Sequence, residues 1–389
     1  LNSDIRNIRT EGVEAYSANI DFVKSTNLKN KLFYGFEYVL NDVTSTGIDE
    51  NIATGSRTEG PSRYPESTWQ SIAGYVNNQY KFSDHLLIQG GFRYNQIILD
   101  ATFDDTFYPF PFSSANINNG ALTGSLGLVF HPQTDLTISA NLATAFRAPN
   151  VDDAGKVFDS EPGSVVIPNP DLKPEYAYNA DLGIAKVFNE MFKVDATGYY
   201  TILDNALVRR DFTLNGQDSI RYDGALSQIQ AIQNAAVATV YGIQIGIEGK
   251  LSSGFGFSSK LNLQKGEEEL DDGSTSSPRH AAPWFGVARL SYDASEIDLE
   301  LYANYQGEKA SEDLSVEEQG KTEIYAADEN GNPYAPAWYT LNFKANYQLT
   351  QMFSVQAGLE NITDQRYRPY SSGLSGPGRN YILSLTADF

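Results

Sequence analysis

Hydrophobic and polar residues alternate with a period of two along most of the chain. In the clearest segment, residues 339–349, Tyr, Leu, Phe, Ala, Tyr and Leu alternate with Thr, Asn, Lys, Asn and Gln. The same pattern recurs at 241–247, 297–305, 355–359 and 381–389. Because successive side chains of a strand point to opposite faces, this pattern predicts β-strands with one apolar face each.

The alternation predicts about fifteen strands. They lie near residues 13–25, 31–41, 69–82, 85–99, 121–131, 134–146, 176–188, 190–208, 236–251, 254–268, 283–293, 295–308, 337–350, 352–363 and 378–389. Tight turns alternate with long connections, which we expect at 42–68, 100–120, 147–175, 209–235, 269–282, 309–336 and 364–377.

Three features separate this pattern from that of a soluble β-sandwich. The predicted strands are long, about 10 to 15 residues against the usual 5 or 6. Short and long connections alternate strictly. Aromatic residues gather near strand ends, at Trp69, Tyr80, Trp284, Tyr292, Trp338 and Tyr347. Short inner turns, long outer loops and aromatic girdles are typical of a transmembrane antiparallel β-barrel, so we predict an all-β fold in a bacterial outer membrane.

Composition narrows the function further. The 389 residues carry 49 acids against 28 bases, a net charge of −21, and no Cys. The lack of a basic stretch argues against nucleic-acid binding. The acidity favours either solubility or acidic outer loops, such as 267–272. The sequence contains no run of about 18 apolar residues, so no membrane-spanning helix is predicted.

We expect the chain to be a mature or truncated segment of a longer protein. It starts at Leu1, without a signal peptide. An odd strand count whose last strand ends at the periplasm requires at least one further strand before Leu1, since single-chain bacterial barrels have even counts.

Three stretches carry more than periodicity. The first, Phe146-Arg147-Ala148-Pro149-Asn150, stands at the outer end of a predicted strand. The second, Asn169-Pro170-Asp171-Leu172-Lys173-Pro174-Glu175, enters the next strand. The third is Leu359-Glu360-Asn361-Ile362-Thr363-Asp364-Gln365-Arg366-Tyr367, followed by Gly376-Pro377-Gly378-Arg379-Asn380 and the terminal Phe389.

In order and spacing, these stretches resemble the C-terminal barrel of a TonB-dependent outer-membrane receptor, most like those of the Bacteroidetes type. The resemblance covers essentially the whole chain, residues 1–389. It implies a 22-stranded barrel filled by a plug. The plug, about seven strands and the segment that contacts TonB would then lie upstream. The implied partners are TonB, outer-membrane lipid and lipopolysaccharide, and the barrel-assembly machinery, which would read Phe389.

Each stretch also has a structural interpretation. Pro149, Pro168, Pro170 and Pro174 restrict the backbone of a long loop, with ligand contact as the alternative. Asn361 and its neighbours end a strand and start a loop. Gly376-Pro377-Gly378 forms a turn into the last strand, and Arg379 faces the lumen, where it could pair with acids of the plug.

The resemblance leaves the cargo open between haem and a ferric siderophore. The first two stretches resemble boxes of haem receptors, but residues 150–168 contain neither the expected His nor a Tyr. His280 is the only His expected at an outer loop. Anionic siderophores favour Arg and aromatic partners. The candidate ligand-binding residues are Arg147, Arg209, Arg210, Tyr222, Arg279, His280, Tyr325, Arg368 and Tyr370.

We predict no catalytic residue, metal site or cofactor, because the sequence has no phosphate-binding loop, His-Glu-x-x-His motif or nucleophile elbow. The expected function is import of a scarce nutrient from the outer loops to the periplasm. The alternatives are a passive porin or structural barrel, and an importer of glycans or peptides from the same family.

Overall fold

The computed structural model describes residues 4–104, 106–107, 113–155, 163–222, 225–270, 273–279 and 281–388. Within these ranges, fifteen long strands form an antiparallel meander in which each strand pairs with the next along the chain. They are β1 (Ile5–Asn27), β2 (Asn30–Asn51), β4 (Glu66–Lys81), β5 (Leu86–Thr102), β6 (Ser114–Gln133), β7 (Leu136–Arg147), β9 (Glu175–Phe188), β10 (Phe192–Asp211), β12 (Ala225–Lys250), β13 (Phe255–Glu269), β15 (Phe285–Asp293), β16 (Ile297–Gln306), β19 (Trp338–Gln348), β20 (Phe353–Glu360) and β21 (Asn380–Ala387).

The long connections carry small elements of their own. Four short strands join the main sheet: β3 (Arg57–Gly60), β8 (Ser164–Val166), β11 (Ser219–Tyr222) and β14 (Thr275–Ser276). A separate hairpin consists of β17 (Ala326–Ala327) and β18 (Pro333–Tyr334). The connections also contain the helices α1 (Val151–Gly155) and α2 (Val316–Gln319). None of the helices in the described ranges is long and apolar enough to cross a membrane.

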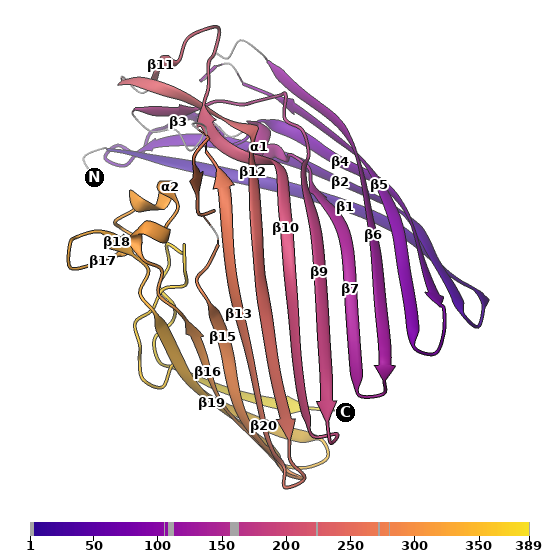
Figure 1. Cartoon of the computed structure of the whole chain (residues 1–389). Coiled ribbons are helices and arrows are strands. Elements are labelled where there is room, and N and C mark those ends of the chain that lie inside the picture. Colours follow the sequence, from indigo (N-terminus) through magenta and orange to yellow (C-terminus); the bar gives the residue numbers. More distant parts are fainter. Residues whose placement is uncertain are drawn as a thin grey trace.

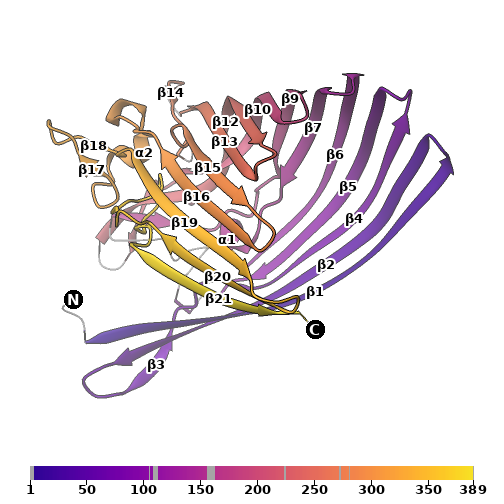
Figure 2. The same cartoon turned by 90° about the horizontal axis from the view of Figure 1, so that it is seen from below.

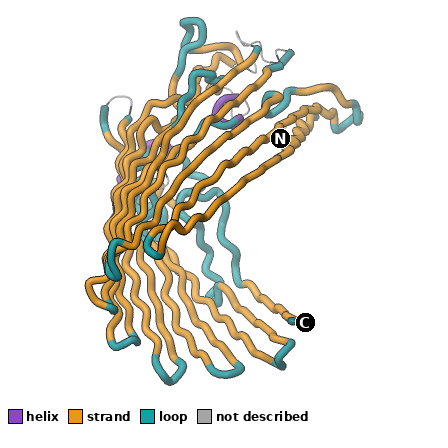
Figure 3. Tube along the Cα trace, turned by 90° about the vertical axis from the view of Figure 1, so that its right-hand side faces the viewer, coloured by secondary structure: helices purple, strands orange, loops and turns teal. Residues whose placement is uncertain are grey.

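The sheet is a curved wall with two different ends. The tight turns lie at one end, and the long connections with α1, α2 and β11 gather at the other (Figure 1). Seen along the wall, the strands curl into a trough (Figure 2). Its edges are β1 and β21, which pair only with β2 and β20 in the described part of the chain (Figure 3).

The structure confirms the predicted all-β fold and each of the fifteen strands. Several strands extend further into the long connections than the sequence indicated, notably β2, β6 and β12. Residues 42–51, 114–120 and 225–235 were expected in loops because polar residues interrupt the apolar alternation there. In these extensions the buried side chains, such as Ile117 and Ile229, pack against the long connections and do not face lipid.

The two faces of the wall differ as the alternation requires. On the face that we call outer, Phe257, Leu290, Leu301 and Phe343 are exposed and lie in one register row across four strands. On the opposite, inner face, the buried Asn342 donates a hydrogen bond to the carbonyl oxygen of Tyr302 at 3.3 Å. Polar groups thus pair on the inner face, and apolar groups cover the outer one.

Only some of the aromatic residues predicted to form girdles face outward. Tyr80, Trp284 and Tyr347 are exposed, as a girdle requires. Trp69 instead packs against the buried cluster around Leu99 and donates its indole N–H to the carbonyl of Pro149 at 3.3 Å. Trp338 shares the inner face of its strand with Thr340 and Asn342 and packs on Tyr367, with ring centroids 4.5 Å apart. The sequence correctly placed Trp69 and Trp338 near strand ends, but the prediction that their side chains belong to a lipid-facing girdle was wrong.

Candidate functional site

The Phe146–Asn150 motif anchors the loop between β7 and β9. Arg147 Nη2 lies 2.7 Å from Asp153 Oδ1, and Asp153 and Asn150 exchange side chain–backbone hydrogen bonds at the start of α1. Burial raises the pKa of Asp153, although the hydrogen bond to the Asn150 backbone and the charge of Arg147 oppose this shift. Pro149 is fully buried, while Ala148 is half-buried and Phe146 packs on Tyr176.

The second motif closes the same loop onto the wall. Asn169 is buried, donates to the carbonyl oxygen of Ile232 at 2.8 Å and accepts the Asp171 amide at 3.1 Å. Leu172 packs with Leu99, Ile117 and Val151 in a buried cluster, and Pro170 is half-buried. The contacts of both motifs fit their structural interpretation, and direct ligand contact by Arg147 stays a prediction.

The third motif shapes the loop between β20 and β21. Asn361 has a φ of +48°, accepts the Gln365 amide at 2.9 Å and donates to the Gln365 and Pro377 carbonyls at 2.9 and 3.0 Å. Arg379 donates its backbone N–H to Asp364 Oδ1 at 2.8 Å and its guanidinium to the Ile362 carbonyl at 3.0 Å. At Gly378 a β-carbon would lie 2.9 Å from Asp364 Oδ1, so a side chain there would disturb this turn.

The predicted ligand-binding residues fall into separate groups. Arg147 lies beside α1. Arg209 and Arg210 lie at the outer end of β10, where Arg210 donates to the carbonyl of Glu269 at 3.0 Å. Tyr222 ends β11. His280 and Phe389 lie outside the described residues.

Four predicted residues from three loops meet around a fifth that was not predicted, Glu318. The Tyr370 hydroxyl donates to Glu318 Oε2 at 2.7 Å, and the Tyr325 ring lies 6.3 Å from that of Tyr370. Arg279 Nε stands 3.9 Å from Glu318 Oε1. Arg368 contributes one step further out, through a 3.0 Å bond to the carbonyl of Glu323.

Glu318 is fully buried, and hydroxyl donors compensate for its burial. Burial alone would raise its pKa, but hydrogen bonds from Ser371 (2.5 Å) and Tyr370 outweigh this and lower the pKa. Burial and the neighbouring carboxylate raise the pKa of Tyr370 and of Tyr325 well above the usual range. Glu318 is therefore ionised at neutral pH, and both phenols are protonated.

Lys309 adds a buried cation to this cluster. Its ammonium donates to the carbonyl of Ala281 at 2.6 Å and lies 4.6 Å from the centroid of the Tyr370 ring. Burial lowers the pKa of Lys309, while the charges of Glu318 and Asp313 oppose this. Lys309 and Glu318 were not predicted, because both occur in a charged loop whose sequence is typical of a solvated surface.

Next to this cluster lies a cavity of about 340 Å³ with aromatic walls and cationic residues. Its lining includes Tyr325, Trp338, Tyr367, Arg366 and Arg368. Within the described ranges, the Trp338 indole N–H is buried without a hydrogen-bond partner. Since buried donors are normally paired, this group is suited to a polar ligand or ordered water. No group of three or more His, Cys, Asp or Glu in the same ranges is arranged to hold a metal ion.

Comparisons with known proteins agree with this architecture. Residues 2–362 match a family model described as "TonB dependent receptor-like, beta-barrel". The probable hemoglobin and hemoglobin-haptoglobin-binding protein 4 of Haemophilus influenzae is 26% identical over 68% of this chain and 29% of its own length. The hemoglobin-haptoglobin utilization protein B of Neisseria meningitidis serogroup A is 24% identical over 85% of this chain and 45% of its own length.

Solved structures share the fold at low sequence identity. The copper transporter OprC superposes with a TM-score of 0.77 at 14% identity, over 98% of this chain and 57% of that one. The ferric-catecholate import receptor Fiu from E. coli K12 gives 0.66 at 16%, over 98% and 55%. The chain spans less than half the length of the two hemoglobin-binding relatives.

Proposed function

Because the chain belongs to the family of TonB-dependent receptor β-barrels, we propose that it forms the C-terminal barrel wall and outer loops of an energy-dependent import receptor in the bacterial outer membrane. In this proposal a plug and further strands, beyond the residues of this chain, complete the receptor. The outer loops capture the ligand, TonB drives rearrangement of the plug, and the ligand passes into the periplasm. The matched family consists of receptors and transporters.

The proposed cargo is an anionic iron complex, a ferric siderophore or haem. This proposal rests on the cavity between Tyr325, Trp338 and Tyr367, which Arg366 and Arg368 border. Aromatic walls suit a planar ligand, and guanidinium groups bind carboxylate or catecholate oxygens through paired hydrogen bonds. The unpartnered donor Trp338 Nε1 would then bind an oxygen of the ligand.

Relatives support both iron cargoes. Several curated relatives are hemoglobin-binding proteins, while solved neighbours include receptors for ferric catecholates and ferric yersiniabactin. In this chain the interval between the two motif boxes lacks a His, which favours the siderophore. For haem, His280 is the proposed iron ligand, next to Arg279 of the Glu318 cluster.

The test is a titration of the intact receptor in detergent with haemin and, separately, with a ferric catecholate siderophore. Haemin is followed by its Soret band, and the siderophore by quenching of Trp fluorescence. We expect saturable binding that weakens at least about tenfold in Arg366→Ala/Arg368→Ala, as the loss of one charge-assisted hydrogen bond predicts. Arg57→Ala, which removes an exposed Arg of β3 that pairs with Glu50 of β2, is the matched control.

The two ligands distinguish the cargoes. A Soret shift that His280→Ala abolishes would identify haem, whereas siderophore quenching without a haemin response would identify a siderophore. Unchanged affinity in the double Arg variant would contradict the proposed site. A receptor that binds neither compound would remove iron complexes from the proposal.

A further inference from the structure

A second, larger cavity lies on the outer face of the wall. It measures about 1210 Å³ and is lined by strands β9, β10, β12 and β13 together with residues within 275–284 and 308–319. The unbroken register between β12 and β13 places Lys265 on the same face as Phe257 of the outer row. On all four strands the run of lining residues begins and ends with a residue of this outer face. The cavity therefore opens toward the membrane and not toward the lumen.

The part of the cavity nearest the tight turns is apolar. A row of four residues that stand opposite one another across the strands lines it: Leu182, Gly198, Ile243 and Leu263. A β-carbon at Gly198 would have one neighbour within 4 Å, the Gly242 carbonyl oxygen at 4.0 Å, so this position leaves a hollow between larger side chains. An apolar hollow on the lipid-facing surface suits a hydrocarbon chain.

Two residues further toward the long connections, the lining becomes aromatic. Tyr200 stands opposite Tyr241, with ring centroids 6.1 Å apart, and Tyr241 stands opposite Lys265. Trp284 also lines the cavity, is exposed, and lies with its ring 5.9 Å from that of Tyr305. Because Tyr and Trp gather where a membrane meets water, this row marks the level of the lipid head groups.

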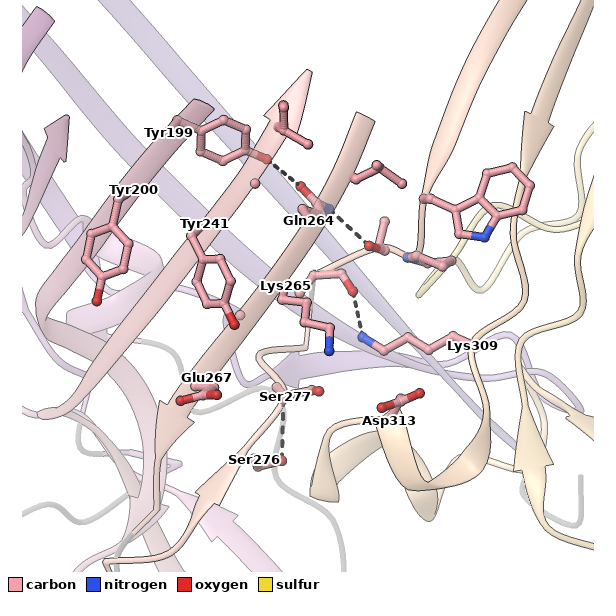
Figure 4. Close-up of a pocket in the computed structure, with 18 of the residues that line it drawn as sticks. Tyr199, Tyr200, Tyr241, Gln264, Lys265, Glu267, Ser276, Ser277, Lys309 and Asp313 are labelled. Atoms are coloured by element: carbon pink, nitrogen blue, oxygen red, sulfur yellow. Dashed lines mark hydrogen bonds between the residues drawn. The ribbon is translucent and has the colours of Figure 1, made fainter. Parts of the chain in front are cut away.

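Charged side chains of the lining are available to a ligand at this level. Lys265 and Glu267 are exposed on β13, and Glu312 and Asp313 are exposed on the loop after β16. None of these four side chains forms an ion pair or a hydrogen bond with another residue in the described part of the chain. Figure 4 shows Lys265 and Glu267 on one side of the cavity and Asp313 on the other.

The balance of charge limits which head group fits. The Lys309 ammonium is already engaged, by the Ala281 carbonyl at 2.6 Å and the Tyr370 ring, which leaves Lys265 as the cation for a ligand (Figure 4). Carboxylates outnumber it, at Glu267, Glu308, Glu312 and Asp313. A purely anionic head group would be repelled by these acids, whereas a head group with both a phosphate and an amine complements both signs of charge.

From this amphipathic lining and its charges, we propose that the cavity binds a glycolipid of the outer leaflet, the lipid A part of a lipopolysaccharide, whose phosphate carries an amine. Its acyl chains would lie along the hollow at Gly198, and its phosphate would accept hydrogen bonds from Lys265. Its ammonium would lie between Glu267 and Asp313. The outer leaflet is the source because this head-group level lies at the end of the wall that carries the long connections. The site is separate from the cavity bordered by Arg366 and Arg368 and does not depend on the cargo.

The test uses the intact receptor in bilayers of phosphatidylcholine with brominated acyl chains, which quench the Trp residues that they contact. Trp69 and Trp338 lie on the inner face, so the quenching reports Trp284. Lipid A that carries phosphoethanolamine should displace the brominated lipid and restore the fluorescence. We expect its affinity to exceed that of phosphatidylcholine at least about fivefold, as one added hydrogen bond predicts. Lipid A with a plain phosphate should bind more weakly, and Trp284→Phe should abolish the response.

Protein variants separate the two charged contacts. Lys265→Ala should lower the affinity of both forms of lipid A about fivefold, because both lose the hydrogen bond to the phosphate. Glu267→Gln/Asp313→Asn should remove the preference for the amine-bearing form over the plain form. Lys250→Ala, an exposed Lys at the tight-turn end of β12, is the matched control and should change neither affinity.

Three results would overturn the proposal. Equal affinity of lipid A and phosphatidylcholine at Trp284, or unchanged affinity in Lys265→Ala, would remove the site. Phosphatidylethanolamine that binds as tightly as the amine-bearing lipid A would remove the glycolipid as its occupant, since the head group alone would then account for binding. None of these measurements involves the iron complexes of the cargo titration, so the two proposals fail independently.

Discussion

Glu318 is the residue at which the loop after β16 is tied to the loop after β20. Replacing it with Gln removes the charge that Tyr370 and Ser371 hydrogen-bond. Hydrogen bonds to a charged group contribute about 1.5–3 kcal/mol each, so we expect Glu318→Gln to lower the opening free energy of this loop by about that amount. Hydrogen exchange of the amides in 311–320 measures the loss. Glu312→Gln, an exposed acid of the same loop, should leave exchange unchanged.

The same residue predicts a pH dependence. The hydrogen bonds from Ser371 and Tyr370 hold the pKa of Glu318 below its usual value in the folded loop. Its stabilising contribution is therefore fully present above the unfolded pKa and is lost as pH falls through the lowered folded value. Loop protection should stay constant from pH 7 to pH 5 and decline only below about pH 4. A decline centred near pH 6 would assign the titration to another group.

At residue scale, chemistry predicted part of the Glu318 cluster, and tertiary structure supplied the rest. Arg279, Tyr325 and Tyr370 were candidates because Arg and Tyr in outer loops suit an anionic ligand, and the structure brings them together. Glu318 could not be singled out, since residues 312–318 include four acids in a polar context. Only the packing of three distant loops shows that one of them is fully buried.

At the scale of elements, the loop between β7 and β9 packs on the wall through a buried cluster that the two share. Leu172 is 2% exposed in a cluster with Leu99, Ile117 and Val151. Truncation of a buried Leu costs about 2–5 kcal/mol, so Leu172→Ala should expose the 147–174 segment to exchange and proteolysis. Lys173→Ala removes an exposed side chain and keeps the backbone bonds to Asn234, so it should have no effect.

Exchange that is equally fast in both variants, or equally slow, would contradict this role of Leu172. The two Pro-rich motifs could be located from the sequence, but their function as the core of one loop could not. That core forms because Leu99 of β5, Ile117 of β6 and Ile232 of β12 pack against the loop. Polar residues interrupt the alternation in the extensions of β6 and β12, so the sequence does not predict strands there. Strand number and order, in contrast, followed directly from the period of two.

At the scale of the whole molecule, the two faces of one sheet meet different surroundings, and this limits where a strand edge can stay unpaired. The outer row from Phe257 to Phe343 meets lipid, while inner polar side chains pair with one another. Lipid offers no hydrogen-bond partner, so the sheet is stable in a membrane only where each strand is paired on both sides.

The two edges of the sheet lead to the last prediction. In the described chain, β1 spans 23 residues and pairs only with β2, and β21 pairs only with β20. Unpaired strand edges associate with other edges, and each unsatisfied backbone group in hydrocarbon costs several kcal/mol. Residues 1–389 expressed alone should therefore form oligomers in detergent rather than a closed monomer.

The oligomeric state can be measured by light scattering after size exclusion. Barrel closure can be measured by comparing gel mobility with and without boiling. The intact receptor should run as a monomer whose mobility changes on heating, and the 1–389 chain should show neither property. A heat-modifiable monomer with slowly exchanging amides along β1 would mean that β1 finds a partner within these residues. The wall would then have to close between β1 and β21, which requires a tighter curvature than the trough in Figure 2.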